Sequence, residues 1–310
     1  MNFSRAVVTG SEGFIGGHLV DKLLEMGIAV LGIDDMSSGL ESTLELHLRN
    51  KNYISRPISI NDQRVSLVLQ KFKPDIVFHL AAKAGVVSSI VDPAFTDLVN
   101  VNGSVNVFEA ARLSGAKRVV FSSSSSVYGG SKNLPTKESE PLDPKSPYAL
   151  QKLTAENYCK LYSKIYGLDT ISLRYFNVFG PRQRSDSDYA AVIAAFISAE
   201  KSGISPKIYG SGEQFRDFLY VKNAVCANIL AANSEDKFSG DILNIGTGAT
   251  TTVNKLCGML CSKSPEYLER RPGDVFCSMA NIERAKELIG YHPKWSLESG
   301  LKDTMAHACL

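Results

Sequence analysis

The sequence has no long apolar run and little excess of charge. None of its segments reaches the roughly 18 apolar residues of a membrane-spanning helix, and its start lacks the basic-then-apolar pattern of an export signal. We therefore expect no membrane insertion, no export and a cytoplasmic location. The 34 Lys and Arg residues nearly balance the 32 Asp and Glu residues, giving a net charge of +2. Such a balance does not indicate a nucleic-acid-binding surface.

Cysteine and histidine are few and scattered. Of the six cysteines, Cys257 and Cys261 are four residues apart, but no Cys-x-x-Cys pair occurs, and the five histidines do not cluster. Zinc sites draw about four such ligands from short, characteristic spacings. The sequence therefore predicts no metal site, and we expect reduced thiols.

Short apolar stretches alternate with amphipathic stretches of helical length along the 310 residues. We expect strands to end near Thr9, Asp34, Leu80, Phe121 and Tyr175, with helices between them. This alternation predicts an α/β fold with a doubly wound parallel sheet, in which ligands bind beyond the carboxyl ends of the strands. With 44% hydrophobic residues, the chain can form one large domain or two coupled ones.

The first strand runs directly into three glycines. Gly10, Gly13 and Gly16 stand at three-residue spacing, and an amphipathic helical stretch follows. Such glycines let the backbone approach a pyrophosphate at a helix N-terminus. A second strand ends at Asp34, eighteen residues beyond the last glycine, where a carboxylate can bind both adenosine ribose hydroxyls and repel a 2′-phosphate. This order predicts a Rossmann-type NAD site, the alternative being a glycine-rich turn in an ordinary βαβ unit.

Tyr148 and Lys152 follow a run of five serines, residues 122–126, that comes after an apolar strand. Their spacing places the phenol and the ammonium on one face of a helix, where the positive charge favours the phenolate. Lowering the pKa of a phenol from about 10 to about 7 requires roughly 4 kcal/mol. One ammonium is too weak for this shift, so we expect a second cation, such as an oxidised nicotinamide ring, beside Tyr148. The alternatives are a solvated helical pair and a flexible serine turn.

Further motifs accompany the glycine start. They are His79-Leu80-Ala81-Ala82, Ser122-Ser123-Ser124, Tyr148-x-x-x-Lys152, Arg174-Tyr175-Phe176-Asn177-Val178-Phe179-Gly180, residues 215–221, residues 244–248 and Arg271-Pro272-Gly273-Asp274. Together they cover nearly the whole chain, which resembles the extended short-chain dehydrogenase/reductase family. Within that family the chain is most similar to nucleotide-sugar 4-epimerases acting on UDP-hexoses and UDP-N-acetylhexosamines.

This resemblance implies an isomerase that inverts C4 of the sugar. Tyr148 would take the proton of the C4 hydroxyl, helped by Ser124, while C4 gives a hydride to bound NAD; the 4-keto sugar then turns its other face and takes the hydride back. Lys152 would contact the nicotinamide ribose. Dehydratase relatives carry Asp-Glu where this chain has Ser125 and Ser126, which argues against water elimination.

The resemblance also implies the residues that contact each ligand. Those expected at NAD are Gly10, Gly13, Phe14, Ile15, Gly16, Asp34, Asp35, Ser37, Ser38, Gly39, Ser59, Ile60, Leu80, Ala81, Ala82, Lys83, Ser122, Tyr148, Lys152 and Tyr175. Those expected at the UDP-sugar are Lys83, Ser124, Ser125, Tyr148, Asn177, Val192, Tyr209, Arg216, Arg271, Asp274 and Ser278. In the second group the two arginines would hold the diphosphate, Asp274 the ribose hydroxyls and Tyr209 the uracil.

The chain departs from its relatives at positions that bear on the ligands. Ser59 stands where many relatives have an Asp that contacts adenine. Val87 stands where a uronate epimerase would carry an Arg, and Asn177 replaces the Thr of that branch, so a neutral hexose is favoured. Ser278, four residues beyond Asp274, is small enough to admit an N-acetyl group that a Tyr would exclude.

We expect residues 1–175 to form the NAD-binding domain, with residues 217–245 returning to it, and residues 176–310 to bind mainly the UDP-sugar. The family resemblance also implies a homodimer through helices near 95–114 and 147–166.

Two alternatives remain open. One is a UDP-glucuronate epimerase or another NAD-dependent sugar-nucleotide-modifying enzyme. The other is a non-catalytic NAD-binding sensor or scaffold, since a fold does not determine a function. The intact set of Tyr148, Lys152 and Ser124 argues against the second alternative, because a sensor needs no base.

Overall fold

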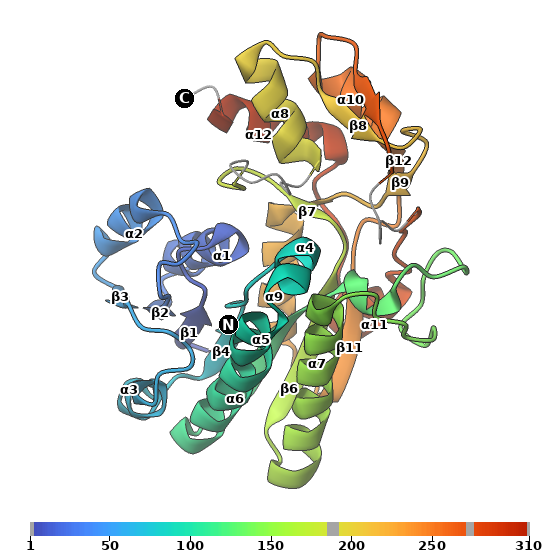
Figure 1. Cartoon of the computed structure of the whole chain (residues 1–310). Coiled ribbons are helices and arrows are strands. Elements are labelled where there is room, and N and C mark those ends of the chain that lie inside the picture. Colours follow the sequence, from blue (N-terminus) through green and yellow to red (C-terminus); the bar gives the residue numbers. More distant parts are fainter. Residues whose placement is uncertain (1–2, 185–191, 271–275, 309–310) are drawn as a thin grey trace.

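The computed structural model describes residues 3–184, 192–270 and 276–308. Its centre is a seven-stranded sheet with the order β11-β6-β5-β4-β1-β2-β3, in which all neighbouring strands are parallel. The strand order reverses between β1 and β4, so the predicted doubly wound architecture is confirmed (Figure 1). The strands are β1 (Arg5–Thr9), β2 (Ala29–Ile33), β3 (Tyr53–Arg56), β4 (Ile76–His79), β5 (Arg118–Ser124), β6 (Asp169–Tyr175) and β11 (Ser239–Ile245).

Helices cover both faces of the sheet. One face carries α3 (Arg64–Phe72), α6 (Gly103–Ser114) and α7 (Pro147–Tyr166), and the other carries α1 (Phe14–Glu25), α9 (Val221–Asn233) and α11 (Glu283–Ile289). Each set buries its apolar side against the sheet in a separate cluster, because strands buried on both faces need two cores. The shorter elements of this part are α2 (Glu41–Leu48), α4 (Val86–Val91), α5 (Pro93–Asp97), the π-helical turn η1 (Leu98–Asn102) and the 3-10 turn η2 (Ser125–Tyr128).

The predicted strand ends are confirmed within one residue at every strand except β5. That strand continues three residues past Phe121, because residues 122–124 pair in register with residues 173–175 of β6. Ser123 in this extension is buried, and its hydroxyl donates to Glu156 Oε1 at 2.5 Å. The first three serines of the run therefore form a strand end and the last two begin η2, so the run is not the flexible turn that its composition alone suggests.

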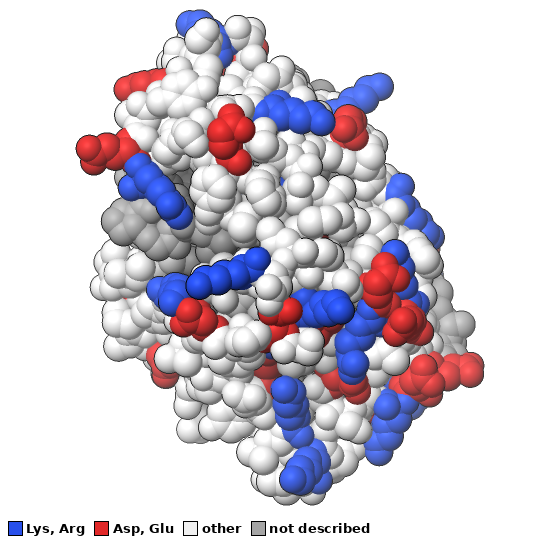
Figure 2. Space-filling view, turned by 90° about the vertical axis from the view of Figure 1, so that its right-hand side faces the viewer, with Lys and Arg blue, Asp and Glu red and all other residues white. Residues whose placement is uncertain are grey.

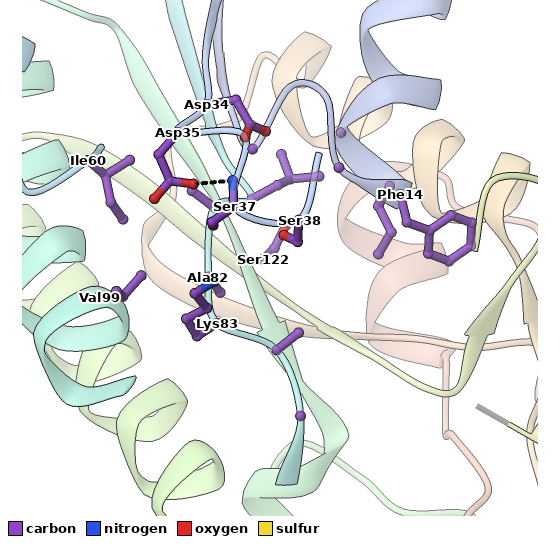
Figure 3. A pocket seen from close by; sticks show the side chains of 18 of the residues that line it. Phe14, Asp34, Asp35, Ser37, Ser38, Ile60, Ala82, Lys83, Val99 and Ser122 are labelled. Carbon is purple, nitrogen blue, oxygen red and sulfur yellow. Dashed lines mark hydrogen bonds between the residues drawn. The ribbon is translucent and has the colours of Figure 1, made fainter. Parts of the chain in front are cut away.

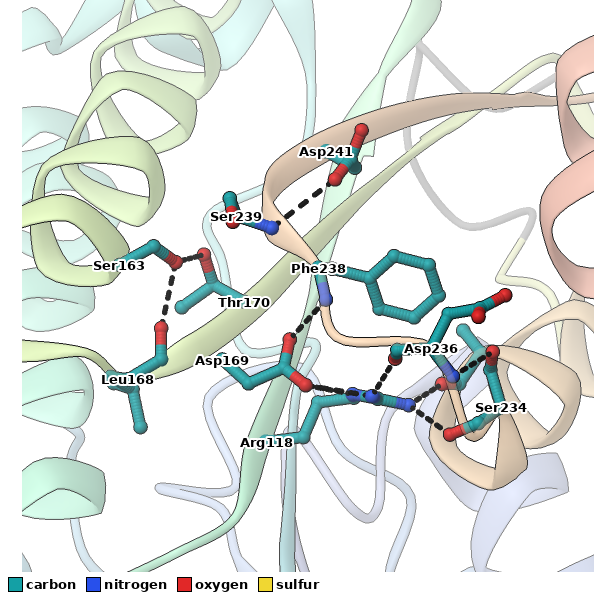
Figure 4. Close-up of polar contacts among 11 residues, drawn as sticks. Arg118, Ser163, Leu168, Asp169, Thr170, Ser234, Asp236, Phe238, Ser239 and Asp241 are labelled. Atoms are coloured by element: carbon teal, nitrogen blue, oxygen red, sulfur yellow. Dashed lines mark hydrogen bonds and ion pairs between the residues drawn. The ribbon is translucent and has the colours of Figure 1, made fainter.

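A buried arginine anchors the end of α9 and the turn before β11 to the sheet (Figure 4). Arg118, at the start of β5, donates to Asp169 Oδ2 at 2.9 and 2.7 Å. Its remaining N–H groups donate to the carbonyls of Ala231, Ser234 and Asp236. Carbonyl oxygens at the end of α9 thus find a cationic partner, which helix C-termini favour.

The remaining elements form a smaller body beyond the carboxyl ends of the strands (Figure 1). Their apolar side chains make a third cluster. Residues 280–291, in contrast, pack on the sheet in the same core cluster as α9. The sequence did not indicate that this segment returns to the sheet. The elements of the smaller body are β7 (Val178–Phe179), α8 (Val192–Ser202), β8 (Lys207–Tyr209), β9 (Phe215–Arg216), β10 (Leu219–Tyr220), β12 (Thr251–Thr252), α10 (Val253–Leu260), β13 (Glu266–Leu268) and α12 (Leu297–Ala308).

Among the described residues, no helix is both long and apolar enough to cross a membrane. The same residues hold no group of three or more potential metal ligands. On the face shown in Figure 2, Lys and Arg side chains are intermixed with Asp and Glu, so this face has no single-sign patch of the kind that binds nucleic acid.

Candidate active site

A cavity of about 580 Å³ lies at the carboxyl ends of β1, β2, β4 and β5, where the strand order reverses (Figure 3). Its lining comes from stretches far apart in the sequence: the glycine loop, the segments after β2 and β4, the serine strand and α7. All the residues that we expected at NAD line this cavity, except Gly39 and Ser59. The geometry of each stretch decides which ligand the cavity fits.

The glycine loop forms an anion cradle. Gly10 has a φ of 72°, which residues with side chains rarely adopt, and a Cβ on Gly16 would overlap the carbonyl oxygen of Gly10. Helix α1 begins at Phe14 with no side-chain cap at Gly13, so its first N–H groups remain available to a ligand. A pyrophosphate fits this cradle, because the helix dipole and the N–H groups both favour an anion.

Asp34 lies directly after β2, at the end of the cavity where we expect the adenosine ribose of NAD. Its Oδ2 accepts from the Glu12 N–H at 3.1 Å and its Oδ1 from the Met36 N–H at 2.8 Å. Burial raises the pKa of Asp34, and these N–H groups oppose the rise. Behind it lies the buried Glu12, whose carboxylate accepts hydrogen bonds from Ser11 and Tyr53. Asp34, which lines the cavity, fits the ribose of NAD in this place and disfavours a 2′-phosphate, while Glu12 stays outside the lining.

Gly39 and Ser59 lie outside the cavity lining. The Ser59 hydroxyl accepts a hydrogen bond from the Asn61 N–H at 3.3 Å, so it stabilises the local turn. Ile58 and Ile60, on either side of Ser59, line the cavity instead. Their apolar side chains suit the face of a planar base.

Tyr148 and Lys152 lie in the first two turns of α7, and both line the cavity. Ser146 caps this helix, since its hydroxyl accepts from the N–H three residues further on at 3.2 Å. The Tyr148 N–H donates to the hydroxyl of Ser89 on α4 at 3.1 Å. Two serines therefore fix the end of the helix that carries the expected base.

Lys152 is only 3% exposed, so the alternative of a solvated helical pair is wrong. Its ammonium donates to the Ser122 carbonyl at 2.8 Å. It lies 4.9 Å from the centre of the Phe121 ring and 5.9 Å from that of Tyr148. Burial lowers the pKa of Lys152 to about 8, and the charge of Glu156 opposes this shift.

Burial also raises the pKa of Tyr148 to about 12, while its hydrogen bond with Ser124 works against the rise. Bringing this phenol to a pKa of about 7 would therefore take roughly 7 kcal/mol, more than the roughly 4 kcal/mol for a free phenol. The need for a cationic ligand beside Tyr148 is thus greater than the sequence indicated. Ser124 stands at the end of β5, where its hydroxyl accepts from the Ser126 N–H at 3.2 Å.

A buried ion pair lies one helical turn beyond Lys152. The Glu156 carboxylate accepts from Arg174 Nε at 2.8 Å and Nη2 at 2.6 Å, and from the Ser123 hydroxyl. Neither charged side chain is more than 1% exposed. The guanidinium carbon also lies 4.7 Å from the centre of the Tyr128 ring. Such two-pronged pairing fixes both side chains and so holds β5, β6 and α7 together.

Asn177, Arg216 and Ser278 come together beyond the sheet. The Asn177 amide donates to the Ser278 hydroxyl at 3.1 Å and to the Asp217 carbonyl at 3.0 Å. Arg216 donates through Nη1 to the Phe276 carbonyl at 2.9 Å. Three of the residues that we expected at the UDP-sugar are therefore neighbours, although they span about a third of the sequence.

The other residues that we expected at the substrate are more dispersed. Lys83 lines the cavity, with its ammonium 5.6 Å from the centre of the Phe95 ring. Ser125 begins η2, directly after the serine strand. Val192 and Tyr209 lie outside the cavity lining, as do Ser124, Ser125, Asn177, Arg216 and Ser278. Arg271 and Asp274 lie outside the described residues.

Some residues that support the site carry no motif in the sequence. Asn100, in the π-helical turn, accepts from the Lys83 N–H at 2.8 Å and donates to the Gln151 side chain at 2.8 Å, which joins the cavity wall to α7. Arg182 lines the cavity from the loop after β7. Nothing near either residue in the sequence distinguishes it from a solvated side chain.

Asp217, which lies within the motif of residues 215–221, also supports the site, and it is fully buried. Its carboxylate accepts from the N–H groups of Thr247 at 2.8 Å, Gly248 at 3.0 Å and Ala280 at 3.1 Å. One carboxylate thereby ties the loop after β11 to the segment that carries Ser278. Its place directly after Arg216 was the one available signal.

Comparison with known proteins agrees with this geometry. The model of the NAD dependent epimerase/dehydratase family matches residues 6–246. The UDP-glucose 4-epimerase of Mycolicibacterium smegmatis is 38% identical over 97% of each chain, and the UDP-glucuronate 4-epimerase of Thermodesulfobacterium geofontis is 34% identical over 96% of this chain and 94% of its own.

Solved structures agree over the whole chain. The UDP-N-acetylglucosamine 4-epimerase from Methanobrevibacter ruminantium, in complex with UDP-N-acetylmuramic acid, is 41% identical with a TM-score of 0.94, covering 100% of this chain and 99% of its own. The UDP-glucose 4-epimerase from Thermotoga maritima, with UDP-glucose, is 39% identical with a TM-score of 0.93, covering 98% of each chain.

Proposed function

The chain belongs to the NAD-dependent epimerase/dehydratase family, and we propose that it inverts C4 of a UDP-hexose or UDP-N-acetylhexosamine with NAD as its resident cofactor. One observation carries this proposal. Tyr148 and Lys152 line a cavity whose glycine cradle and Asp34 suit NAD, and Ser124 is hydrogen-bonded to Tyr148. The similar proteins named above are 4-epimerases of UDP-sugars.

The residues at and beside the cavity have separate roles in the proposed reaction. The glycine cradle and Asp34 would hold NAD, which would supply a reversible hydride acceptor for C4 of the sugar. Tyr148 takes the proton of the C4 hydroxyl and gives it back to the oxygen after inversion, so the base ends as it began. Lys152 keeps a positive charge beside the phenol, and Ser124 orients the hydroxyl. Between the two proton transfers the 4-keto sugar presents its other face while its nucleotide stays held.

Residues near the proposed catalytic set support one class of substrate over others. Ser125 and Ser126 supply no acid for water elimination, which supports epimerisation over dehydration. Val87 offers no cation to a sugar carboxylate, and Asn177 lies against Ser278 as a neutral pair. These features support a neutral hexose over a uronate.

The division of the chain remains part of the proposal. Residues 1–175 together with residues 217–245 would bind NAD, and residues 176–310 would bind mainly the UDP-sugar. The cytoplasmic location that we expect from the sequence belongs to the same proposal.

We also propose a homodimer through α5, η1, α6 and α7. These helices lie side by side and expose several large apolar side chains, which solvent disfavours in a contiguous patch. Light scattering should report a dimer, and Leu150→Glu should dissociate it. The exposed side chains are Phe95, Leu98, Leu113, Leu150, Leu161, Ile165 and Tyr166.

A substrate panel tests the proposed reaction. Purified protein is incubated with UDP-glucose, UDP-galactose, their N-acetylated counterparts, UDP-glucuronate and dTDP-glucose, and the products are followed by NMR. We expect the C4 epimers of the UDP-hexoses to interconvert. Conversion of UDP-glucuronate alone would favour the uronate alternative, and a protein that contains NAD but converts none of these sugars would favour the sensor alternative.

A further inference from the structure

A side-chain junction joins α1 to the loop after β7, outside the catalytic set. Arg182, in that loop, donates through Nη2 to Asp21 Oδ2 and, at 2.9 Å, to His18 Nδ1. The other ring nitrogen of His18 lies 2.9 Å from the Pro181 carbonyl oxygen. We refer to Arg182, His18 and Asp21 as the α1 latch.

The two contacts of His18 determine its tautomer. A carbonyl oxygen can only accept, so Nε2 carries the proton, and a guanidinium can only donate, so Nδ1 is the unprotonated acceptor. The ring must be neutral to make both bonds. Burial, together with the charge of Arg182, lowers the pKa of His18 to about 4. The latch is therefore complete at neutral pH, with both ring nitrogens used.

Asp21 provides the charge that balances Arg182. Its Oδ1 accepts from His47 Nε2 on α2 at 3.0 Å, so one carboxylate joins α1, α2 and the loop. Burial works to raise the pKa of Asp21, but the hydrogen bonds from His47 and Arg182 lower it overall. The side chains of Arg182 and Asp21 are 15% and 27% exposed, so solvent screens this pair less than an ordinary surface pair.

The latch lies at the cofactor end of the cavity. Arg182 lines the cavity together with Gly13, Phe14 and Ile15 of the anion cradle. His18 packs edge-on against the Phe14 ring, with 6.0 Å between the ring centres. Arg182 also has a φ of 65°, which side-chain-bearing residues rarely adopt and keep only where surrounding contacts enforce it. The bonds of its side chain supply that enforcement.

We propose that the α1 latch is a positioning device that retains NAD, because it holds residues 180–183 against the helix whose N-terminus receives the pyrophosphate. The inference rests on the proposed function, in which one NAD molecule serves successive cycles and must not leave between them. The latch residues act through the loop and the cradle and not on the reacting atoms. Opening the latch releases the loop from α1 and gives the cofactor a path out.

The test measures the release rate of bound NAD from full-length protein. Asp21→Asn and Arg182→Gln each remove one charge of the latch, and Arg284→Gln is the matched control, since Arg284 pairs with Asp241 between α11 and β11. Released NAD is trapped by excess alcohol dehydrogenase and ethanol and read as NADH fluorescence. We expect release at least about tenfold faster in both latch variants, equivalent to about 1.4 kcal/mol. The control should release NAD at the wild-type rate.

A second variant perturbs the latch without changing a charge. A Cβ on Gly17 would lie 3.2 Å from Arg182 Nη1 and 3.0 Å from Thr43 Cγ2, so Gly17→Ala should push the guanidinium and speed release by a smaller factor. The double variant of Asp21 and Arg182 should release NAD no faster than either single variant, because both belong to one device. In all these latch variants, added NAD should restore turnover.

Two results would overturn the inference. One is release within about twofold of wild type in both charge variants, which is the size of ordinary non-additivity. The other is a loss of turnover that added NAD does not restore, which would place these residues in folding or chemistry; thermal denaturation of each variant separates those two. Absence of NAD from the wild-type protein would count against the proposed function instead, so the two failures are distinguishable.

Discussion

Removing the Lys152 ammonium tests how the phenolate of Tyr148 arises. Lys152→Met keeps most of the side-chain stem and deletes the charge, which lies 5.9 Å from the centre of the Tyr148 ring. At an effective dielectric constant of about 20, a unit charge at that distance is worth about 2.8 kcal/mol, or about 2 pKa units. Lowering the Tyr148 pKa from about 12 to about 7 takes roughly 7 kcal/mol. A unit charge at the Lys152 position therefore amounts to less than half of this difference, and in the proposed mechanism the bound ligands supply the rest.

The pH dependence of kcat/KM, measured with saturating NAD, reports how much Lys152 lowers the pKa of Tyr148. In the proposed mechanism the reaction needs deprotonated Tyr148, so the rate should rise with pH through the pKa of that group. In Lys152→Met this rise should move up by about 2 units, with a loss of about a hundredfold at pH 7. Wild type should also lose rate on the alkaline side, as Lys152, whose pKa burial lowers to about 8, gives up its proton. The variant has no such alkaline loss.

Lys83→Met is the matched control, since Lys83 is the other ammonium that lines the cavity and it lies over the Phe95 ring. Lys83→Met should move the rise of kcat/KM with pH less far than Lys152→Met does. Because we also expect Lys152 to bind the nicotinamide ribose, the NAD content of each variant is measured alongside. The reasoning is refuted if the rise of kcat/KM with pH does not move in Lys152→Met, or if Lys83→Met moves this rise equally far.

Three further predictions follow from the site. Tyr148→Phe should keep NAD and UDP-sugar binding yet lose at least about a hundredfold in turnover; normal turnover would remove Tyr148 from the mechanism. Mass spectrometry of the nucleotide released on denaturation should show NAD, and mainly NADP would contradict the role of Asp34. Wild type should turn over N-acetylated and plain UDP-hexoses alike. Ser278→Tyr, which replaces a hydroxyl 3.1 Å from the Asn177 amide, should slow the N-acetylated sugars by a further 5- to 150-fold, roughly 1–3 kcal/mol of overpacking; equal slowing of both would contradict it.

Features set by nearby residues were predictable from the sequence. Gly10, Gly16 and Asp34 belong to one βαβ unit, and Tyr148 and Lys152 to one helix, so spacing alone places them together. Apolar runs likewise located most strand ends. The apolar pattern failed at β5, because its last three residues are serines whose burial depends on partners in other elements. The Ser123 hydroxyl is buried by Glu156, and the Ser122 carbonyl receives Lys152.

Features that depend on distant residues were not predictable. Arg182 and His18 are 164 residues apart, and the Asp217 carboxylate and the Ala280 N–H are 63 apart. An arginine in a loop rich in Gly, Pro and Ser is most often solvated, and no local pattern shows that this one turns inward. Asn100 is a similar case, because its partners come from the segment after β4 and from α7.

The Glu156–Arg174 pair explains why the charge of Lys152 is not cancelled. Glu156 is four residues beyond Lys152 on the same helix, a spacing at which Glu and Lys normally pair. Arg174 and Ser123 occupy both oxygens of Glu156 instead, and no carboxylate within the described residues is in ion-pair contact with Lys152. An ion pair to Glu156 would draw the ammonium towards the carboxylate and weaken its field at Tyr148. The buried charges of Glu156 and Arg174 neutralise each other, and the charge of Lys152 stays available to the phenol of Tyr148.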